Sequence, residues 1–288
     1  QLLDVLVATS GDTGGAVALG FLGVEGTRVT ILYPKGKVSK VQEEQLTTNG
    51  QNIRALEVDG TFDDCQALVK RAFNDEELNS SLRLTSANSI NIARLIPQTF
   101  YYFWAYAQLK SQGADQVVFT VPSGNFGNIG AGLLAYKMGL PVKHFVAGTN
   151  VNDTVPRFLQ DGQYAPRLSV QTLANAMDVG APSNFERLRW LHADDDDALR
   201  TGFRTAAVDD AAIRELITRR HAAAGELFCP HTATAVKVLE QLRGEGVQGD
   251  WAVAATAHPA KFEAVVEPLI GRAIEVPPAL AALLERPA

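Results

Sequence analysis

The segment VVFTVPSGNFGN, residues 117–128, is the clearest indication of the fold, because an apolar strand-like run passes there into a glycine-rich turn that opens a helix-like run. A second stretch, VLVATSGDTGG at residues 5–15, has the same order of elements. Glycines at a helix N-terminus let an anion approach the first backbone N–H groups, which have no intrahelical partner and lie at the positive end of the helix dipole. Two such turns predict a phosphorylated cofactor, an anionic substrate, or both.

Strand-like and helix-like runs alternate along most of the chain. Strands are predicted at Val5–Ala8, Val29–Leu32, Ile53–Val58, Val117–Val121, His144–Ala147 and Trp251–Ala255. Helices are predicted at Thr13–Leu22, Ser39–Thr48, Phe62–Phe73, about Ile90–Leu109, Ile129–Tyr136, Val155–Leu159, Phe185–Leu191, Ala211–Ala223, Thr232–Leu242 and from Pro259 onward. Repeated βα units indicate mainly parallel sheets. Between residues 150 and 207 we otherwise expect loops.

Local signals also mark a helix start and a division of the chain. Ser39 with Gln42 three residues later has the form of a capping box. After Ser86 the βα pattern repeats on a larger scale, beginning with a long aromatic helix. We therefore predict the α/β class, with a smaller unit at residues 1–83 and a larger one at residues 84–288.

The composition excludes several classes of protein. The formal net charge is −6 and no block of lysine and arginine occurs, which argues against nucleic acid or an anionic membrane as the main partner. Cys65 and Cys229 lie far apart without a CxxC partner, so neither a disulfide framework nor a zinc site is indicated and a cytoplasmic protein is expected. No apolar run approaches the roughly 18 residues of a membrane span.

The turn after residue 121 lies at the carboxyl end of a predicted parallel strand, where α/β proteins bind ligands. Its glycines, Gly124, Gly127 and Gly130, are spaced GxxGxxG rather than in the dinucleotide pattern GxGxxG, and the chain has no GxxxxGK[ST] element. A single phosphate group held by backbone N–H groups is therefore favoured over a nucleotide. The alternative is a tight βα turn that needs glycine for its geometry alone.

The turn at residues 9–14 offers hydroxyl groups as well as helix-start amides. Ser10 and Thr13 together with those amides suit a carboxylate. Asp12 is unexpected in an anion pocket, since its charge would repel the ligand unless it points toward a protonated group or caps the helix. Both explanations of Asp12 stay open at this point.

A third polar segment lies at the start of the long aromatic helix. Asn88 and Ser89 are placed at the positive helix end, and Arg94 lies beyond the first turn. An arginine fork added to N-terminal amides makes a strong phosphate receptor. The alternative is that Arg94 is an ordinary surface residue.

Two later segments are also polar. Thr256 follows a predicted strand and lies at the carboxyl edge of the sheet, where its hydroxyl can donate or accept a hydrogen bond. His258, before Pro259, could be a base, but we favour a role as a helix-start partner. The aspartates at residues 194–197 are expected to form a solvated loop rather than a metal site.

Taken together, these segments resemble threonine synthase of the longer bacterial and fungal type, a family of fold type II pyridoxal-phosphate enzymes. The resemblance covers nearly the whole chain. Its motifs are ATSGDTGG (8–15), ILYPKG (31–36), NSINIAR (88–94), VPSGNFGN (121–128), NVNDTVPRF (150–158), NAMDVGAPSNFERL (175–188), CPHTA (229–233) and TAHPAKF (256–262). It implies two mainly parallel three-layer α/β units, similar to the β subunit of tryptophan synthase, with the cofactor in the larger unit.

The resemblance also implies a reaction, the conversion of O-phospho-L-homoserine and water to L-threonine and phosphate with pyridoxal 5′-phosphate as cofactor. For the cofactor it implies a phosphate site at Gly124, Asn125, Phe126, Gly127 and Asn128, with Thr256 facing the pyridine nitrogen and Asp12 near the phenolic oxygen. For the substrate it implies Thr9, Ser10 and Thr13 beside the carboxylate, and Asn88, Ser89 and Arg94 on the phosphate. No metal is implied.

The chain departs from the family at the covalent anchor of the cofactor. The family's Schiff-base lysine lies in a Phe-Lys-Asp element before the ATSGDTG turn, and this sequence contains no such element. Gln1 is not Met and the next residues resemble a buried strand, so we expect the lysine to lie upstream of residue 1 and this form to be inactive without it. Lys35, Lys37 and Lys261 lie near the expected edges of the site, but none has the family context.

Two other interpretations stay open. Another fold type II enzyme, such as a dehydratase, is disfavoured by the segment at residues 88–94, because a dehydratase substrate carries no phosphate. A non-catalytic ligand-binding remnant is permitted by the absent lysine. Whether the protein is a monomer or a homodimer cannot be read from the sequence.

Overall fold

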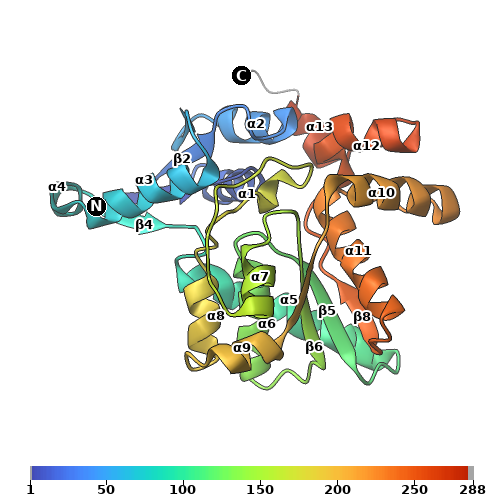
Figure 1. Cartoon of the computed structure of the whole chain (residues 1–288). Helices are drawn as coiled ribbons and strands as arrows, with labels where there is room; N and C mark the ends of the chain where they lie inside the picture. The colour runs from blue at the N-terminus through green and yellow to red at the C-terminus, as the bar shows by residue number, and fades with distance from the viewer. Residues whose placement is uncertain (1, 285–288) are drawn as a thin grey trace.

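The computed structural model describes residues 2–284, in which the strands form two four-stranded parallel sheets (Figure 1). The first sheet has the order β3-β2-β1-β4 and contains β1 (Leu3–Ala8), β2 (Thr27–Pro34), β3 (Ile53–Val58) and β4 (Arg83–Ser86). The second has the order β7-β6-β5-β8 and contains β5 (Val117–Pro122), β6 (His144–Thr149), β7 (Arg204–Ala207) and β8 (Asp250–Val253). Every strand pairing in these sheets is parallel, which confirms the predicted α/β class.

Helices connect the strands of each sheet. The first sheet is accompanied by α1 (Asp12–Phe21), α2 (Lys40–Thr47), α3 (Phe62–Asn74) and α4 (Glu76–Ser81). The second is accompanied by α5 (Ile92–Ser111), α6 (Gly127–Lys137), α7 (Thr154–Asp161), the 3-10 turn η1 (Asn175–Met177), α8 (Phe185–Leu191), α9 (Asp196–Gly202), α10 (Asp210–Ala224) and α11 (Pro230–Gly244). The turn η2 (Pro259–Phe262), α12 (Glu263–Ile270) and α13 (Pro278–Leu284) follow β8.

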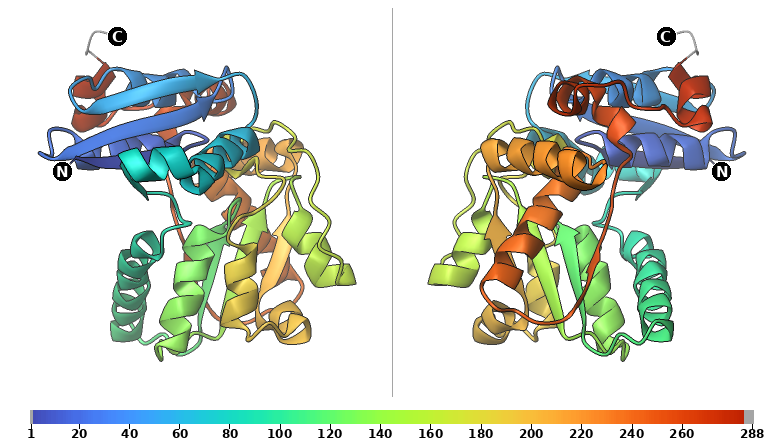
Figure 2. Two further views of the ribbon diagram at one scale, coloured as in Figure 1. Left: turned by 90° about the vertical axis from the view of Figure 1, so that its left-hand side faces the viewer. Right: turned by 90° about the vertical axis from the view of Figure 1, so that its right-hand side faces the viewer.

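Each sheet is covered on both faces, because alternate residues of a strand point to opposite sides. In the second sheet, Phe119 and Phe145 pack against Tyr102 of α5, whereas Val118 and Val146 belong to a separate core with residues of α11. In the first sheet, α1 and α3 likewise contribute to two different cores. The result is three layers in each unit (Figure 2). Because both faces are covered, all six residues of β5 are buried, and the strand is therefore almost wholly apolar.

The boundary between the two units does not fall at a single point of the chain. β4 pairs with β1, so the first sheet continues to Ser86, past the predicted end of the smaller unit at residue 83. After β8 the chain leaves the second sheet. Its helix α12 packs on α10, whereas η2 and α13 contact α2 of the smaller unit (Figure 1).

The structure confirms one local prediction and corrects another. The capping box of α2 is confirmed, since Ser39 Oγ accepts the N–H of Gln42 at 3.2 Å and the Ser39 N–H donates to Gln42 Oε1 at 2.9 Å. The prediction of a loop at the aspartate run was wrong in part, because α9 begins at Asp196 with Asp195 as its N-cap. Carboxylates are stabilised at that end of a helix by the free N–H groups and the dipole.

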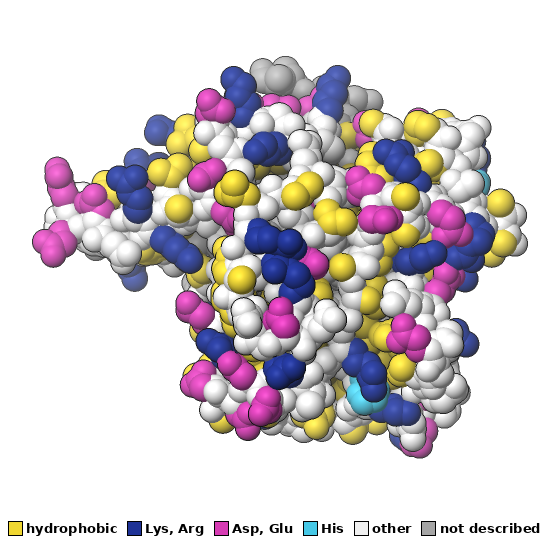
Figure 3. Space-filling view, in the orientation of Figure 1, with side chains coloured by type: hydrophobic (Ala, Val, Ile, Leu, Met, Phe, Trp, Pro, Cys, Tyr) yellow, Lys and Arg dark blue, Asp and Glu magenta, His cyan; other side chains and the backbone are white. Residues whose placement is uncertain are grey.

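On the face of the molecule drawn in Figure 3, acidic and basic side chains are interspersed and do not form a large patch of one charge. Within residues 2–284, no group of three or more His, Cys, Asp or Glu side chains is placed to hold a metal ion. Over the same range, none of the helices is both long and apolar enough to cross a membrane.

Candidate active site

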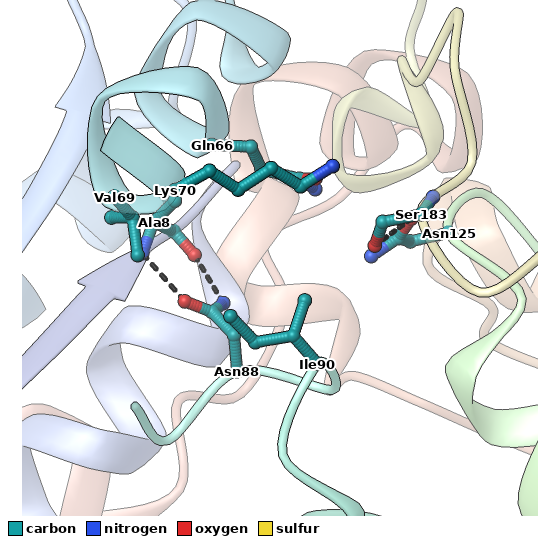
Figure 4. Close-up of a pocket in the computed structure, with 8 residues that line it drawn as sticks. All are labelled: Ala8, Gln66, Val69, Lys70, Asn88, Ile90, Asn125 and Ser183. Carbon is teal, nitrogen blue, oxygen red and sulfur yellow. Dashed lines mark hydrogen bonds between the residues drawn. The ribbon is translucent and has the colours of Figure 1, made fainter. Parts of the chain in front are cut away.

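Residues from both units line one pocket between the two sheets (Figure 4). Ala8, at the end of β1, and Asn88 lie on one side of it, and Asn125 and Ser183 lie on the other. Lys70 of α3 extends into the space between them. The structure thus brings residues of the turn after β1 and of the turn after β5 to the same place.

The turn after β5 has the features of an anion site. Phe126, the N-cap of α6, is left-handed with φ 59° and offers no side-chain cap. The backbone N–H groups of residues 124–129 have no hydrogen-bond partner among the described residues. A Cβ atom on Gly124 would lie 2.5 Å from Cα of Met177, so the turn needs glycine for close packing. Free N–H groups at a helix start and a glycine-shaped cradle fit a phosphate group.

Asn125 connects this turn to the segment at residues 88–94. Its Nδ2 donates to Ser89 Oγ at 3.3 Å, and its Oδ1 accepts the N–H of Ser183 at 2.6 Å. Asn184 Nδ2 donates to the same Ser89 hydroxyl at 2.7 Å. Ser89 therefore lies directly beside the turn that fits a phosphate.

Two further side chains, those of Tyr102 and Arg187, form hydrogen bonds with residues of the turn after β5 and with the segment at residues 88–94. Asn128 Oδ1 accepts the hydroxyl of Tyr102 at 2.6 Å. Arg187 Nη1 donates to the backbone oxygen of Ser89 at 2.6 Å and also bonds Asn184 Oδ1. Burial lowers the pKa of Arg187, although a guanidinium still remains charged. Sequence reasoning did not single out Asn184 or Arg187, which were visible only as members of the motif at residues 175–188.

The segment at residues 88–94 is tied to the first unit. The amide of Asn88 is paired with Ala8, since its Nδ2 donates to the Ala8 oxygen at 2.6 Å and its Oδ1 accepts the Ala8 N–H at 2.7 Å (Figure 4). Arg94 donates from Nη1 to the Ala87 oxygen at 2.9 Å and from Nη2 to Thr13 Oγ1 at 3.2 Å. These contacts and its partial burial contradict the alternative that Arg94 is an ordinary surface residue.

The hydroxyl groups of the turn after β1 have different surroundings. Thr9 is fully buried, and its Oγ1 accepts the N–H groups of Gly11 and Gly14 at 3.0 and 2.8 Å, so it serves the start of α1. Ser10 Oγ donates to the Ala176 oxygen of η1 at 3.3 Å. The structure therefore places Ser10 between the two units, and Thr9 beneath the turn.

Asp12 does not cap its helix. The N-cap of α1 is Gly11, and no side chain caps this helix. The Asp12 carboxylate instead forms an ion pair with Lys261 Nζ and accepts Gln42 Nε2 at 3.2 Å. The helix-capping explanation was therefore wrong, and the protonated group that the other explanation requires is Lys261.

The segment after β8 supplies the remaining predicted residues. Thr256 is exposed and lies three residues after the end of β8 at Val253. His258 Nδ1 accepts the N–H of Ala260 at 3.2 Å at the start of η2, which confirms the expected helix-start role.

A buried histidine accepts a hydrogen bond from the backbone of η1. His231 Nε2 accepts the N–H of Ala176 at 3.0 Å. Burial lowers the pKa of His231, but the interactions with Cys229 and the charges of Asp12 and Asp178 together outweigh it, so the pKa lies above its ordinary value. His231 thereby fixes the same turn whose carbonyl receives Ser10.

Comparison with known proteins identifies close relatives. Residues 3–257 match the family described as "Pyridoxal-phosphate dependent enzyme", and residues 232–288 match "Threonine synthase, C-terminal". Threonine synthase of Serratia marcescens is 49% identical over 287 residues, which are 100% of this chain and 66% of that protein.

Solved structures agree with this result. The crystal structure of threonine synthase from Escherichia coli has a TM-score of 0.92 and 48% identity, and the match covers 100% of this chain and 66% of that one. The structure of PLP-bound threonine synthase from Brucella melitensis has a TM-score of 0.85 and 39% identity, with 100% and 67% covered. The chain thus spans about two thirds of the length of these relatives.

Proposed function

The chain belongs to the pyridoxal-phosphate dependent enzymes and, within them, to the threonine synthase family, and we propose that the protein containing it converts O-phospho-L-homoserine and water into L-threonine and phosphate. The observation that carries this proposal is the contact between Asn125 and Ser89. It joins a turn of free backbone N–H groups to a segment bearing an arginine. A phosphorylated substrate reacting on a phosphorylated cofactor needs two such anion sites side by side.

The residues around the turn after β5 fit the cofactor. The N–H groups of residues 124–129 would hold its phosphate, and Thr256 would face the pyridine nitrogen. When bound, pyridoxal phosphate supplies an electron sink that stabilises negative charge on substrate carbons. A hydroxyl at Thr256, instead of a carboxylate, would leave the nitrogen largely unprotonated and moderate this effect. Asp12 would lie near the phenolic oxygen.

The substrate would lie between the two turns. Ser10 and Thr13, with Thr9 shaping the turn, would bind its carboxylate. Ser89 and Arg94 would bind its phosphate, and charge-assisted bonds from a guanidinium would stabilise the departing phosphate as its negative charge grows. Asn88, whose amide is paired with Ala8, would hold this segment in place.

These residues form the non-covalent part of the site. The family's proton-transferring lysine belongs to an element that is not found in these 288 residues, so we assign no catalytic lysine to this chain. A cytoplasmic location is part of the proposal, because the two cysteines are free and buried, as in a reducing compartment. The alternative of a dehydratase has less support, since the relatives reported above are threonine synthases.

The proposal can be tested on the product of the complete coding sequence that contains this chain. The protein is loaded with pyridoxal phosphate, and binding is monitored by the absorbance of the cofactor. O-phospho-L-homoserine is then added. Release of inorganic phosphate together with L-threonine is expected. A protein that binds the cofactor but releases no phosphate from this substrate would contradict the proposal.

A further inference from the structure

An ion pair joins the turn after β1 to the segment after β8. Lys261 Nζ contacts Asp12 Oδ1 across 249 positions of sequence. The two side chains are only 15% and 24% exposed, respectively. The neighbouring residues restrict the orientation of these two largely buried side chains more than solvent would restrict an ion pair on the surface.

The surroundings of the pair are specific. Gln42 is fully buried, and its Nε2 donates to Asp12 Oδ1 at 3.2 Å. Its Oε1 accepts the N–H of Ser39 at 2.9 Å and Nδ2 of Asn175 at 3.1 Å, which sets the orientation of the amide. The backbone of Lys261 is held as well, because its oxygen accepts Ser39 Oγ at 3.0 Å. Asp12 therefore receives donors from two elements whose own positions are fixed.

The ion pair neutralises the negative charge of Asp12 in a turn that is proposed to bind a carboxylate. Ser10 and Thr13 flank Asp12 and are the residues proposed to bind the substrate carboxylate. An unpaired aspartate between them would repel that carboxylate, because two like charges would come into contact. The Lys261 ammonium brings the formal charge of the pair to zero and draws the Asp12 carboxylate toward α2 and η2.

We infer that Lys261 is a positioning residue that admits a ligand carboxylate to the turn at residues 9–14 by neutralising and holding Asp12. This inference rests on the proposed function, because it takes an α-amino acid phosphate as the ligand. It adds a determinant of specificity: the site accepts a ligand with a carboxylate only while Asp12 is paired.

The test uses two ligands that cannot release phosphate, because each has a C–P bond in place of the ester, and that differ only in the carboxylate. One is 2-amino-5-phosphonopentanoate, in which CH₂ replaces the ester oxygen of the substrate, and the other is its decarboxylated form, 4-aminobutylphosphonate. Dissociation constants are measured by calorimetry on the cofactor-loaded product of the complete coding sequence. Lys261→Met is compared with Lys261→Arg, with the double variant Asp12→Asn/Lys261→Met, and with the control Lys40→Met, whose side chain is 84% exposed.

The expected pattern separates a charge effect from a structural one. Lys261→Met should weaken binding of the amino acid phosphonate by about tenfold or more while changing that of 4-aminobutylphosphonate by less than about twofold. Lys261→Arg and the double variant should each restore binding to within about threefold of the wild type, because charge balance returns. Equal weakening of both ligands, or a double variant as weak as Lys261→Met, would overturn the inference.

Two controls keep the result decisive. If Lys261→Met does not fold, Asp12→Asn replaces it: this variant should bind the amino acid phosphonate at least as tightly as the wild type, and a tenfold loss overturns the inference. A wild-type protein that binds pyridoxal phosphate but neither phosphonate defeats the proposed function itself. A wild type that binds both ligands, with variants that do not differ, defeats only the role of Lys261.

Discussion

Arg94 Nη2, near the start of α5, lies 3.2 Å from Thr13 Oγ1 in α1, although 81 positions separate the two residues. The guanidinium is oriented at its other end by the Ala87 oxygen, at 2.9 Å from Nη1. The contact brings the group proposed to bind the substrate phosphate next to a hydroxyl proposed to bind the carboxylate. One rigid fork can thereby set the distance between the two ends of a ligand.

Replacing Arg94 by Gln should reduce kcat/KM for O-phospho-L-homoserine by about a hundredfold or more, since a charged donor to phosphate is lost. Affinity for pyridoxal phosphate should change by less than about threefold. Steady-state kinetics and cofactor titration measure the two effects. The control is Arg83→Gln, at an exposed position of β4. Equal losses of substrate and cofactor binding would contradict the assignment of Arg94.

Substituting Gly124 by Ala should weaken pyridoxal phosphate binding by at least about tenfold, because the new Cβ would lie 2.5 Å from the Met177 backbone and displace η1 or the turn. The free energy of unfolding should also fall, by about 1–3 kcal/mol. Gly130→Ala is the matched control, since its Cβ would meet Leu95 at an ordinary 3.7 Å. Within α6 that change should increase the free energy of unfolding by about 0.5–1 kcal/mol. Unchanged cofactor affinity in Gly124→Ala would exclude a close-packed phosphate site.

Removing the hydroxyl of Tyr102 should destabilise the protein by about 1–3 kcal/mol, because Asn128 Oδ1 loses a buried donor at 2.6 Å. The measurement is urea unfolding of Tyr102→Phe. Tyr101→Phe serves as the control: Tyr101 is 41% exposed, and no hydrogen bond of its hydroxyl is found among the described residues. The control should lie within about 0.5 kcal/mol of the wild type. Equal effects at both positions would contradict a role for the Asn128 contact.

The free energy of unfolding should depend on pH through Asp178, which directly follows η1 and accepts hydrogen bonds from Thr172 in the loop before it. Burial raises the pKa of this carboxyl to about 7, against hydrogen bonds from Thr172 and Asn150 that act in the opposite direction. The unfolded value is about 3.9, so the folded state holds the proton more tightly. The resulting stabilisation is complete below about pH 4, is lost as the pH rises toward 7, and does not change further above that pH.

The measurement for Asp178 is the free energy of unfolding from pH 4.5 to 8 for the wild type and for Asp178→Asn. The wild type should lose stability relative to the variant as the pH rises to about 7, because the variant has no proton to release there. Parallel curves over this range would show that Asp178 does not titrate as inferred.

The sequence predicted the local elements well where they are long or have a strong period. The bounds of β3 and α8 were predicted without error, and the capping box at Ser39 is present. β4 and β7 were missed because each has only four residues, RLTS and RTAA, in which polar side chains leave no apolar run. β8 is equally short and also lies at a sheet edge, but it was predicted because apolar residues begin at Trp251.

The site divides in the same way. The turn at residues 124–128 could be located from sequence, since a strand, glycines and a helix start are neighbours along the chain. Arg187 and Asn184 could not be assigned, because their contacts with Ser89 span 98 and 95 positions. A side chain's partner at such a separation depends on how whole elements pack.

The βα alternation, the parallel sheets, the family and the two turns suited to anions could all be inferred from the order of residues, because these follow from short-range periodicity, hydrogen bonding and local motifs. Which polar groups meet depends instead on how the units pack. Asp12 was ambiguous in the sequence, and Lys261 was set aside; the fold pairs them because the segment after β8 returns to the smaller unit. Coulomb energy depends on distance in space, and that distance is set by the packing of the two units.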